Sequence, residues 1–276
     1  MATSIGPHPP LSDNLVYWVD PAISNSYSSD DSGYLYDMRG VYKGGYWNSV
    51  SSTYFRATLT NVTYSANNGG TLVFGSNSKM QYPGYRLNTQ GNHWNKKIVF
   101  GPDKTSWNGC WSYWVKPTSD SFTNSAMLFR SYASSRTDVI WFQHSFTSDN
   151  KFRVTLNNYK GTGSPELHDG YWESSALSAD TWYHIALRPD TTTNMKLRIY
   201  INGDIDTNTN ATITNGSGTY TLSSSGYHAF TGGGGADSHV GFHNDSGTLG
   251  NIFAYDDNIS SADINKIYLG YKGRFS

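Results

Sequence analysis

Two neighbouring segments in the second half of the chain, Thr181–Arg188 and Lys196–Ile201, alternate apolar and polar residues with the period of a β-strand. Successive side chains of a strand point to opposite faces, so every second residue shares a face. Asn202-Gly203, directly after the second segment, can adopt positive φ and predicts a tight hairpin turn whose second arm starts near Asp204. The apolar residues of one face are Tyr183, Ile185 and Leu187 in the first segment and Leu197, Ile199 and Ile201 in the second.

Short segments rich in Val, Ile, Thr, Tyr and Trp recur along the rest of the chain, bounded by Gly, Asn, Asp and Ser. This pattern is typical of strands separated by turns. Many strands with almost no helix between them indicate an all-β antiparallel sandwich or barrel. The predicted strands are Leu15–Asp20, Gly70–Phe74, Trp107–Lys116, Ser125–Ser131, Asp138–Phe146, Lys151–Asn157, Thr181–Arg188, Lys196–Asn202, His239–His243 and Gly250–Tyr255.

One helix is predicted, close to the C-terminus. Ser260 can cap its first turn, and Ile264, Ile267 and Tyr268 fall on one face. We expect one or two turns.

The chain shows no long polar linker and no internal repeat. Residues 14–276 are therefore predicted to form a single domain. Residues 1–13, with three prolines, predict an extended arm. Such an arm could be a docking strap or a poorly ordered end.

Composition narrows the classes of partner. The 276 residues carry 20 basic and 21 acidic side chains. A chain this close to neutral lacks the excess of positive charge with which proteins bind nucleic acid, so nucleic acid is not an expected partner. No segment approaches the about 18 apolar residues of a membrane helix, so no membrane insertion is expected. Cys110 is the single cysteine, which excludes an internal disulfide. The composition looks extracellular, yet the N-terminus does not resemble a signal peptide, and a virion protein would reconcile the two.

Four blocks of sequence follow one another along residues 13–275. They are Leu15–Pro21 with Leu35–Gly40, Gly69–Gly75, Cys110–Thr118 with Thr181–Ala186 and Leu197–Gly203, and Tyr255–Ile264 with Tyr271–Phe275. In their order and spacing these blocks resemble the concanavalin A-like lectin/glucanase superfamily and its laminin-G-like branch. The resemblance implies a two-sheet antiparallel jelly-roll β-sandwich with one short C-terminal helix. The closing block is similar to one that is frequent in bacteriophage virion proteins.

Hydrolytic chemistry finds little support in the sequence. Glucanases of the superfamily resemble one another in a Glu-x-Asp-x-Glu strand, whereas Glu166 and Glu173 are the only glutamates here. They are seven residues apart, and an odd spacing places them on opposite faces of a strand. The residues between them predict a turn. We therefore expect a non-enzymatic protein.

Calcium is the one cofactor that the resemblance suggests. Many laminin-G-like domains hold Ca²⁺ with an acidic residue in a strand that matches Leu249–Tyr255, where this chain has Gly250. Turn and helix-cap roles are the alternative for its aspartates. The remaining candidates for oxygen ligands are Asp20, Asp37, Asp256 and Asp257.

Glycan binding has the best physical basis, because the apolar faces of sugars stack on aromatic rings while amides and carboxylates bind their hydroxyls. Several rings lie in turn-like segments rich in Gly and Asn, where the alternative is packing against the rim of the sandwich. Five strand tryptophans are predicted core: Trp18, Trp111, Trp114, Trp141 and Trp182. The glycan-binding candidates are Trp47, Trp94, Tyr171 and Trp172.

The sequence thus predicts a non-enzymatic phage virion surface protein, such as a capsid decoration, head-fibre or tail module, with glycan-binding capacity. Its expected partners are other virion proteins, through residues 1–13, and host or environmental glycans, and self-association is left open. The alternatives are a secreted or cell-surface carbohydrate-binding module, which would be extracellular, and a glycoside hydrolase with an atypical site.

Overall fold

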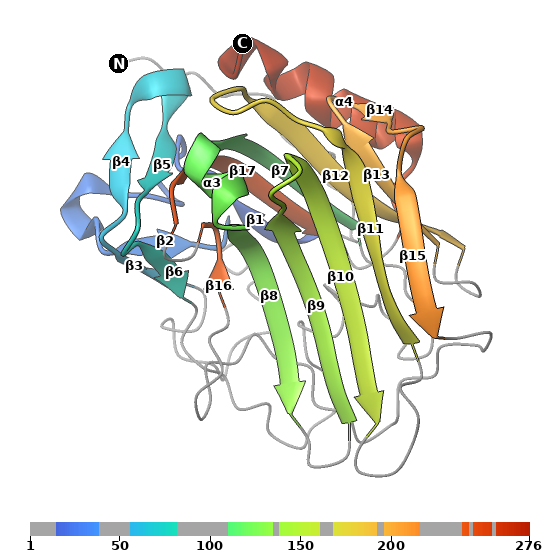
Figure 1. Cartoon of the computed structure of the whole chain (residues 1–276). Coiled ribbons are helices and arrows are strands. Elements are labelled where there is room, and N and C mark those ends of the chain that lie inside the picture. Colours follow the sequence, from blue (N-terminus) through green and yellow to red (C-terminus); the bar gives the residue numbers. More distant parts are fainter. Residues whose placement is uncertain are drawn as a thin grey trace.

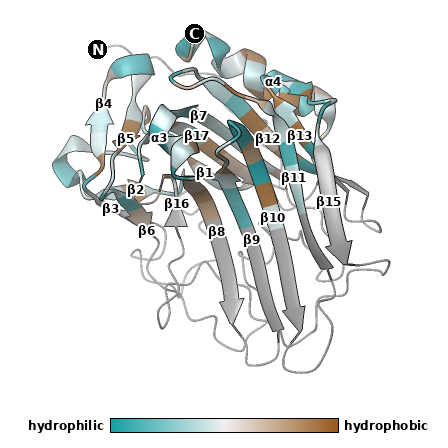
Figure 2. Cartoon of the chain, viewed as in Figure 1, coloured by the Kyte–Doolittle hydropathy of each residue, from teal (hydrophilic) through white to brown (hydrophobic). Residues whose placement is uncertain are grey.

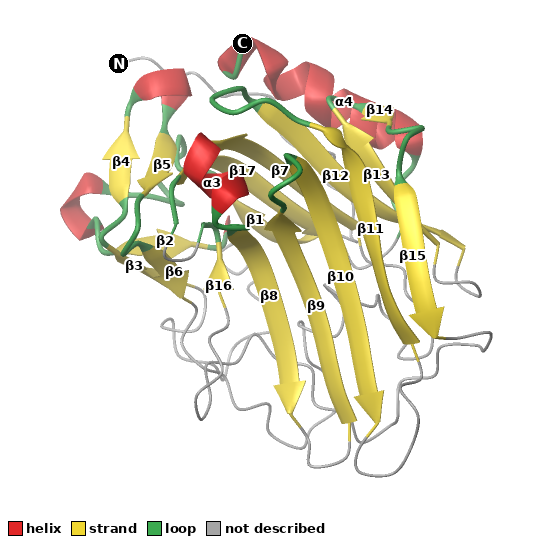
Figure 3. Ribbon diagram, viewed as in Figure 1, coloured by secondary structure: helices red, strands yellow, loops and turns green. Residues whose placement is uncertain are grey.

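Antiparallel strands dominate the structure, a computed structural model that describes residues 15–38, 56–81, 110–134, 138–160, 168–191, 196–215, 239–242, 245–255 and 258–276. The strands form two sheets that face each other, and a helix lies on the outer side of one sheet (Figures 1 and 3). This arrangement confirms the predicted all-β jelly-roll sandwich with a C-terminal helix. Residues 1–13, the predicted arm, lie outside the described residues.

The first sheet, here called sheet A, contains the two segments whose alternation is clearest in the sequence. β1 (Leu15–Val19) pairs with β17 beside the main path of the sheet. Along that path the order is β14 (Asp204–Ile205), β13 (Lys196–Ile201), β12 (Tyr183–Thr191), β7 (Cys110–Pro117), β17 (Gly247–Tyr255), β5 (Thr71–Phe74) and β4 (Thr63–Ser65).

The second sheet, sheet B, contains mostly long strands on one side and short strands on the other. Its order is β15 (Asn210–Asn215), β11 (His168–Ala176), β10 (Lys151–Lys160), β9 (Asp138–Phe146), β8 (Met127–Ser134), β16 (His239–Val240), β6 (Lys79–Gln81), β3 (Arg56–Thr60) and β2 (Tyr34–Tyr36).

The described helices are short apart from the C-terminal one. They are η1 (Ser29–Asp31), η3 (Asn67–Gly69), α3 (Ser119–Thr123), α4 (Ser261–Tyr271) and η4 (Lys272–Arg274). None of them is both long enough and apolar enough to cross a membrane.

The β13–β14 hairpin confirms the turn predicted from Asn202-Gly203. Both turn residues have positive φ, 54° at Asn202 and 87° at Gly203. Ile201 pairs directly with Asp204 across the two-residue loop. Positive φ at both central residues is the geometry whose twist matches that of the flanking strands.

The main core lies between the two sheets. Apolar and polar positions alternate along β10 (Figure 2), so sheet B turns one apolar face inward. Trp111, Tyr113 and Val115 of β7 meet Phe152 and Val154 of β10 in this core, and all five are buried. This apolar contact between the inner faces holds the sandwich together.

Two predicted elements need correction. The C-terminal helix has 11 residues, about three turns rather than one or two, because Tyr271 continues its buried face beyond Ile267. The segment before Glu173, predicted as a turn, is the strand β11 from His168 onward. Its pairing with both β10 and β15 overrides the turn propensity of Asp169-Gly170.

Candidate functional site

The outer face of sheet A is closed by the C-terminal part of the chain. Trp114 of β7 stacks on Tyr268 of α4, with ring centroids 5.8 Å apart, and on Phe275, at 4.6 Å. A methyl group at Gly250 would lie 2.5 Å from Phe275 Cζ, so only glycine lets this ring approach β17 so closely. This second apolar cluster also includes Trp18, Phe253, Ile264 and Ile267, so the face is a second core rather than a free surface.

A buried polar pair lies under α4. Ser112 Oγ of β7 and His184 Nε2 of β12 are 2.8 Å apart, and both residues are buried. Burial lowers the pKa of His184 from its ordinary value to about 3. A hydroxyl beside an imidazole is the pair used by many nucleophilic enzymes. Here neither group reaches the surface, so the pair serves the packing of α4 on sheet A.

A second buried histidine lies between the sheets. His144 of β9 bonds through Nδ1 to the hydroxyl of Tyr113. Burial lowers the pKa of His144 well below its ordinary value and raises that of Tyr113. Both groups are neutral at physiological pH. Sequence alternation does not reveal such a pair, because its two members come from different sheets.

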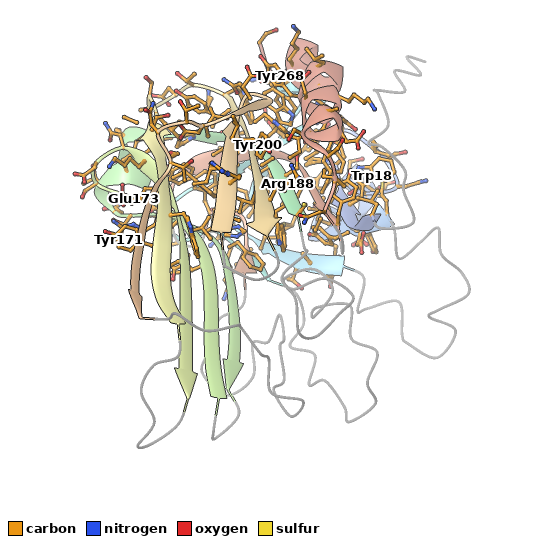
Figure 4. The ribbon with its side chains drawn as sticks, turned by 90° about the vertical axis from the view of Figure 1, so that its right-hand side faces the viewer. Trp18, Tyr171, Glu173, Arg188, Tyr200 and Tyr268 are labelled. Atoms are coloured by element: carbon orange, nitrogen blue, oxygen red, sulfur yellow. The ribbon has the colours of Figure 1, made fainter. Side chains whose placement is uncertain are left out.

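The outer face of sheet B has a different character. Along β10, Phe152 and Val154 point into the main core, so Lys151, Arg153 and Thr155 face outward and are only half-buried. The strand register aligns Arg153 with Glu173 and Thr155 with Tyr171 of β11. Figure 4 shows Tyr171 and Glu173 on the side of β11 that faces away from sheet A, to which Arg188 of β12 and Tyr200 of β13 belong. On the other flank, β9 places Gln143 opposite Thr155.

Three charged side chains form a network on this face. Arg153 donates from Nε to Glu173 Oε1 at 2.8 Å, and its Nη2 contacts the same oxygen. Lys151 Nζ lies 3.3 Å from Glu173 Oε2. Burial alone would raise the pKa of Glu173, but the two cations outweigh it and the net pKa is lowered. Glu173 is therefore ionised and fixed at physiological pH.

The ring of Tyr171 is held in place by the same arginine. The guanidinium carbon of Arg153 lies 4.5 Å from the ring centroid, within the range of a cation–π contact. Tyr171 keeps part of its surface exposed. The outer face of sheet B thus presents a fixed aromatic ring beside hydrogen-bonding groups, on strands that leave little freedom of movement. This group of Gln143, Lys151, Arg153, Thr155, Tyr171 and Glu173 is here called the β9–β11 platform.

Comparison with known proteins defines the family. The family described as the concanavalin A-like lectin/glucanases superfamily matches residues 96–265. The chain belongs to this superfamily. No curated protein sequence matches it.

Two solved structures show how far the likeness extends. Trypanosoma rangeli sialidase in complex with sialic acid is 13% identical with a TM-score of 0.53, and the match covers 100% of this chain and 37% of that one. The receptor-binding domain of botulinum neurotoxin mosaic serotype C/D is 11% identical with a TM-score of 0.54, covering 94% of this chain and 51% of that one. The chain thus spans about a third of the sialidase and half of the toxin domain. At these identities the likeness shows the fold alone.

The four predicted aromatic candidates have different outcomes. Tyr171 lies on the β9–β11 platform. Trp172 is 2% exposed and packs in the main core, so its ring is not available to a sugar, and this prediction needs correction. The error follows from the predicted turn, because in a strand Trp172 must point to the opposite side from Tyr171. Trp47 and Trp94 lie outside the described residues.

The predicted core tryptophans agree better with the structure. Trp18, Trp111 and Trp114 are buried. Trp182 is half-buried and packs against the cluster under α4, with its ring centroid 4.6 Å from that of Phe275. The side chain of Trp141 lies outside the described part of the structure.

Two of the four candidate calcium ligands, Asp20 and Asp37, lie in the described part of the structure, and both have partners within the protein. Asp20 is buried, and Arg274 contacts both of its carboxylate oxygens, at 2.8 Å and 2.9 Å. Asp37 accepts a hydrogen bond from the backbone N–H of Trp18 at 3.0 Å. The described residues contain no group of three or more His, Cys, Asp or Glu that could hold a metal. Asp20, a candidate calcium ligand, thus takes part in an ion pair with Arg274. Asp256 and Asp257 lie outside the described residues.

The departure at Gly250 has a structural reason. Gly250 lies against Phe275 and Trp114, and any side chain there would collide with them. Of the two glutamates weighed as catalysts, Glu173 is in the platform, and Glu166 lies outside the described residues.

Proposed function

We propose that this protein is a carbohydrate-binding module whose β9–β11 platform binds glycans without hydrolysing them. The observation that supports the proposal best is the half-buried ring of Tyr171, held by Arg153 on the outer face of sheet B. Its membership of the concanavalin A-like superfamily is consistent with such a role. Fold alone does not assign a function, so the proposal rests on the side chains of the platform.

The chemistry of the platform suits a sugar. A pyranose ring offers an apolar C–H face to an aromatic ring, and its hydroxyls need donors and acceptors in fixed positions. Tyr171 supplies the ring. Hydrogen bonds to the sugar hydroxyls would come from side chains next to Tyr171: the guanidinium of Arg153, the amide of Gln143 and the hydroxyl of Thr155. Because all four side chains project from paired strands, little ordering entropy opposes binding.

The state of Glu173 supports binding rather than hydrolysis. A general acid must carry a proton near neutral pH, so its pKa has to be raised. The pKa of Glu173 is instead lowered, and both of its oxygens contact Lys151 or Arg153. A glycosidase would also need a second carboxyl about 5–9.5 Å away. The nearby Asp206 is engaged by backbone N–H groups of Ser175 and Asn208.

A glycan array with the parent and three variants tests the proposal. We expect Tyr171→Ala to abolish binding and Tyr171→Phe, which keeps the ring, to retain most of it. Tyr64→Ala is the matched control, because Tyr64 is 37% exposed but lies on β4 of sheet A. Binding that survives Tyr171→Ala, or a parent that binds no glycan, contradicts the proposal.

Hydrolysis is tested separately by the release of reducing sugar from any glycan that binds. We expect none. Release that disappears in Glu173→Gln or Glu166→Gln, with binding unchanged, would make the protein a glycosidase with an atypical site.

We also propose that the module is a component of a phage virion surface, as a capsid decoration, head-fibre or tail module. The near-neutral, ring-rich composition and the closing sequence block support this location. Residues 1–13 would dock on another virion protein. Electron microscopy of intact particles, with and without deletion of residues 1–13, tests it, since the density of the module should vanish on deletion. A fully active secreted module without any particle would favour the alternative.

A further inference from the structure

The charges of the β9–β11 platform are arranged in two levels. Glu173 lies beneath, with 9% of its side chain exposed, whereas the side chains of Lys151 and Arg153 are 26% and 36% exposed. A ligand that approaches from solvent therefore meets two cations before it meets the carboxylate. With two positive groups against one negative group, the network keeps a net charge of +1.

The cations also keep unused hydrogen-bonding capacity. Glu173 engages Nε and Nη2 of Arg153, and the guanidinium carries further N–H groups on Nη1. Lys151 makes one contact to Glu173, at 3.3 Å, and its ammonium has three hydrogens. Charge-assisted hydrogen bonds from such groups to a carboxylate are about twice as strong as bonds between neutral groups.

Tyr171 lies directly beside these donors. Arg153 contacts the ring of Tyr171. Lys151 lies two residues before Arg153 on β10 and projects from the same face of that strand. A sugar placed on the ring would therefore bring its substituents to the exposed ends of both cations. Neutral sugars would gain only hydroxyl contacts there, while an acidic sugar would also gain Coulomb attraction at a partly desolvated surface.

We infer that the ligand class of the platform is acidic glycans, in which a sugar carboxylate meets Lys151 and Arg153 while the sugar ring packs on Tyr171. This inference rests on the proposed glycan-binding function and specifies its substrate class. Hexuronic and nonulosonic acid residues share the required chemistry, a carboxylate attached to a pyranose ring.

Binding is compared on matched polymers with the complete chain. The probes are a homopolymer of galacturonic acid, the same polymer with its carboxyls reduced to alcohols, and a homopolymer of sialic acid. We expect at least one acidic polymer to bind about tenfold or more tightly than the reduced one, as one charge-assisted contact provides. The two acidic polymers distinguish a hexuronic from a nonulosonic source.

Variants assign the effect to the platform. Lys151→Gln should weaken binding of the acidic polymer far more than binding of the reduced polymer, so that most of the preference is lost, while Lys151→Arg should keep the preference. Lys266→Gln is the matched control, since Lys266 is an exposed lysine on α4 with its side chain 69% exposed. The preference should also shrink between 50 mM and 300 mM salt, because salt screens exposed charges.

The outcomes separate the two proposals. Equal, Tyr171-dependent binding of acidic and reduced polymers overturns the acidic-glycan inference and leaves glycan binding intact. A parent that binds none of the polymers or array glycans overturns both. Acidic binding that is insensitive to Tyr171→Ala and is equally weakened by Lys266→Gln indicates unspecific ionic attraction, which also overturns the inference.

Discussion

The two sheets of this sandwich use their outer faces in opposite ways. β7, in the middle of sheet A, is buried on both faces apart from the half-buried Lys116, because α4 and the C-terminal residues cover its outer side. β10, in the middle of sheet B, alternates between buried residues and the half-buried Lys151, Arg153 and Thr155. Sheet A thus carries apolar residues on its second face, and sheet B carries charges and a tyrosine.

This difference indicates where ligand binding can occur. Ser112 and His184 of sheet A, for example, are hydrogen-bonded to each other under α4 and are both buried. The charged groups of sheet B lie at the surface, although Glu173 there is nearly as buried as a core residue. Stability and proposed function are therefore separated between the two faces, and substitutions on each face should have different consequences.

The largest effect is expected from the covered face. Trp114→Ala removes a ring that stacks on both Tyr268 and Phe275, and it should lower the free energy of unfolding by about 3–5 kcal/mol. Tyr171→Ala, on the open face, should lower it by less than about 1 kcal/mol. Urea unfolding measures both. Equal losses in the two variants would mean that the faces do not differ in the way described.

The ion pair that secures the C-terminus should have the next largest effect. Arg274→Met leaves the buried carboxylate of Asp20 without its cation and should cost about 3 kcal/mol. Asp20→Asn in the same chain should recover part of the loss, because the uncompensated charge is then gone. EDTA should leave the melting temperature of the parent unchanged, since Arg274 and not calcium neutralises Asp20. A clear drop with EDTA would restore the calcium interpretation.

Acid should weaken the protein through its buried histidines. His184 has a folded pKa of about 3, against about 6.5 for an unfolded histidine. The unfolded state therefore binds the proton first as pH falls, and stability declines from about pH 7 downward until the folded pKa is passed. For His184 alone the loss is roughly 2 kcal/mol between pH 7 and pH 5.

The lowered pKa of His144 adds a loss in the same direction. Urea unfolding at pH 7, 6 and 5 should show a smaller decline in His184→Gln than in the parent. Identical slopes would place His184 in contact with solvent.

The smallest effect concerns the glycine beneath the C-terminal ring. Gly250→Ala should cost roughly 1 kcal/mol, the low end for overpacking, because one carbon is added and the ring lies next to the chain terminus. Gly273→Ala is the matched control, since a methyl group there meets no atom within 4 Å. Thermal unfolding of the two variants compares them, and a neutral Gly250→Ala would show that Phe275 is not tightly seated.

Much of the fold could be predicted because it depends on local patterns. The alternation in residues 181–188 and 196–201 and the Asn202-Gly203 turn act within a few residues, and both are confirmed. The cover on sheet A could not be predicted, because Phe275 meets Trp114 and Gly250 through contacts that are distant in the sequence. A strand that is apolar on both faces, such as β7, is the signal that points to such a cover.

The site was harder to predict than the fold. Asp169-Gly170 has the composition of a turn, so the sequence did not reveal the strand β11, which directs the side chains of Tyr171 and Trp172 to opposite faces. Once β11 is recognised, alternation alone assigns Trp172 to the core and Tyr171 to the surface. The network around Glu173 needs the register between β10 and β11, which a single sequence does not provide.

Hydroxyl-radical footprinting with a bound glycan tests most directly whether the outer face of sheet B is the binding surface. Oxidation of each tyrosine is measured by mass spectrometry with and without the tightest-binding glycan. We predict that the ligand protects Tyr171, while Tyr64 on sheet A is oxidised at the same rate in both samples. Protection of Tyr64 with Tyr171 unchanged would place the glycan on the other sheet and contradict the account.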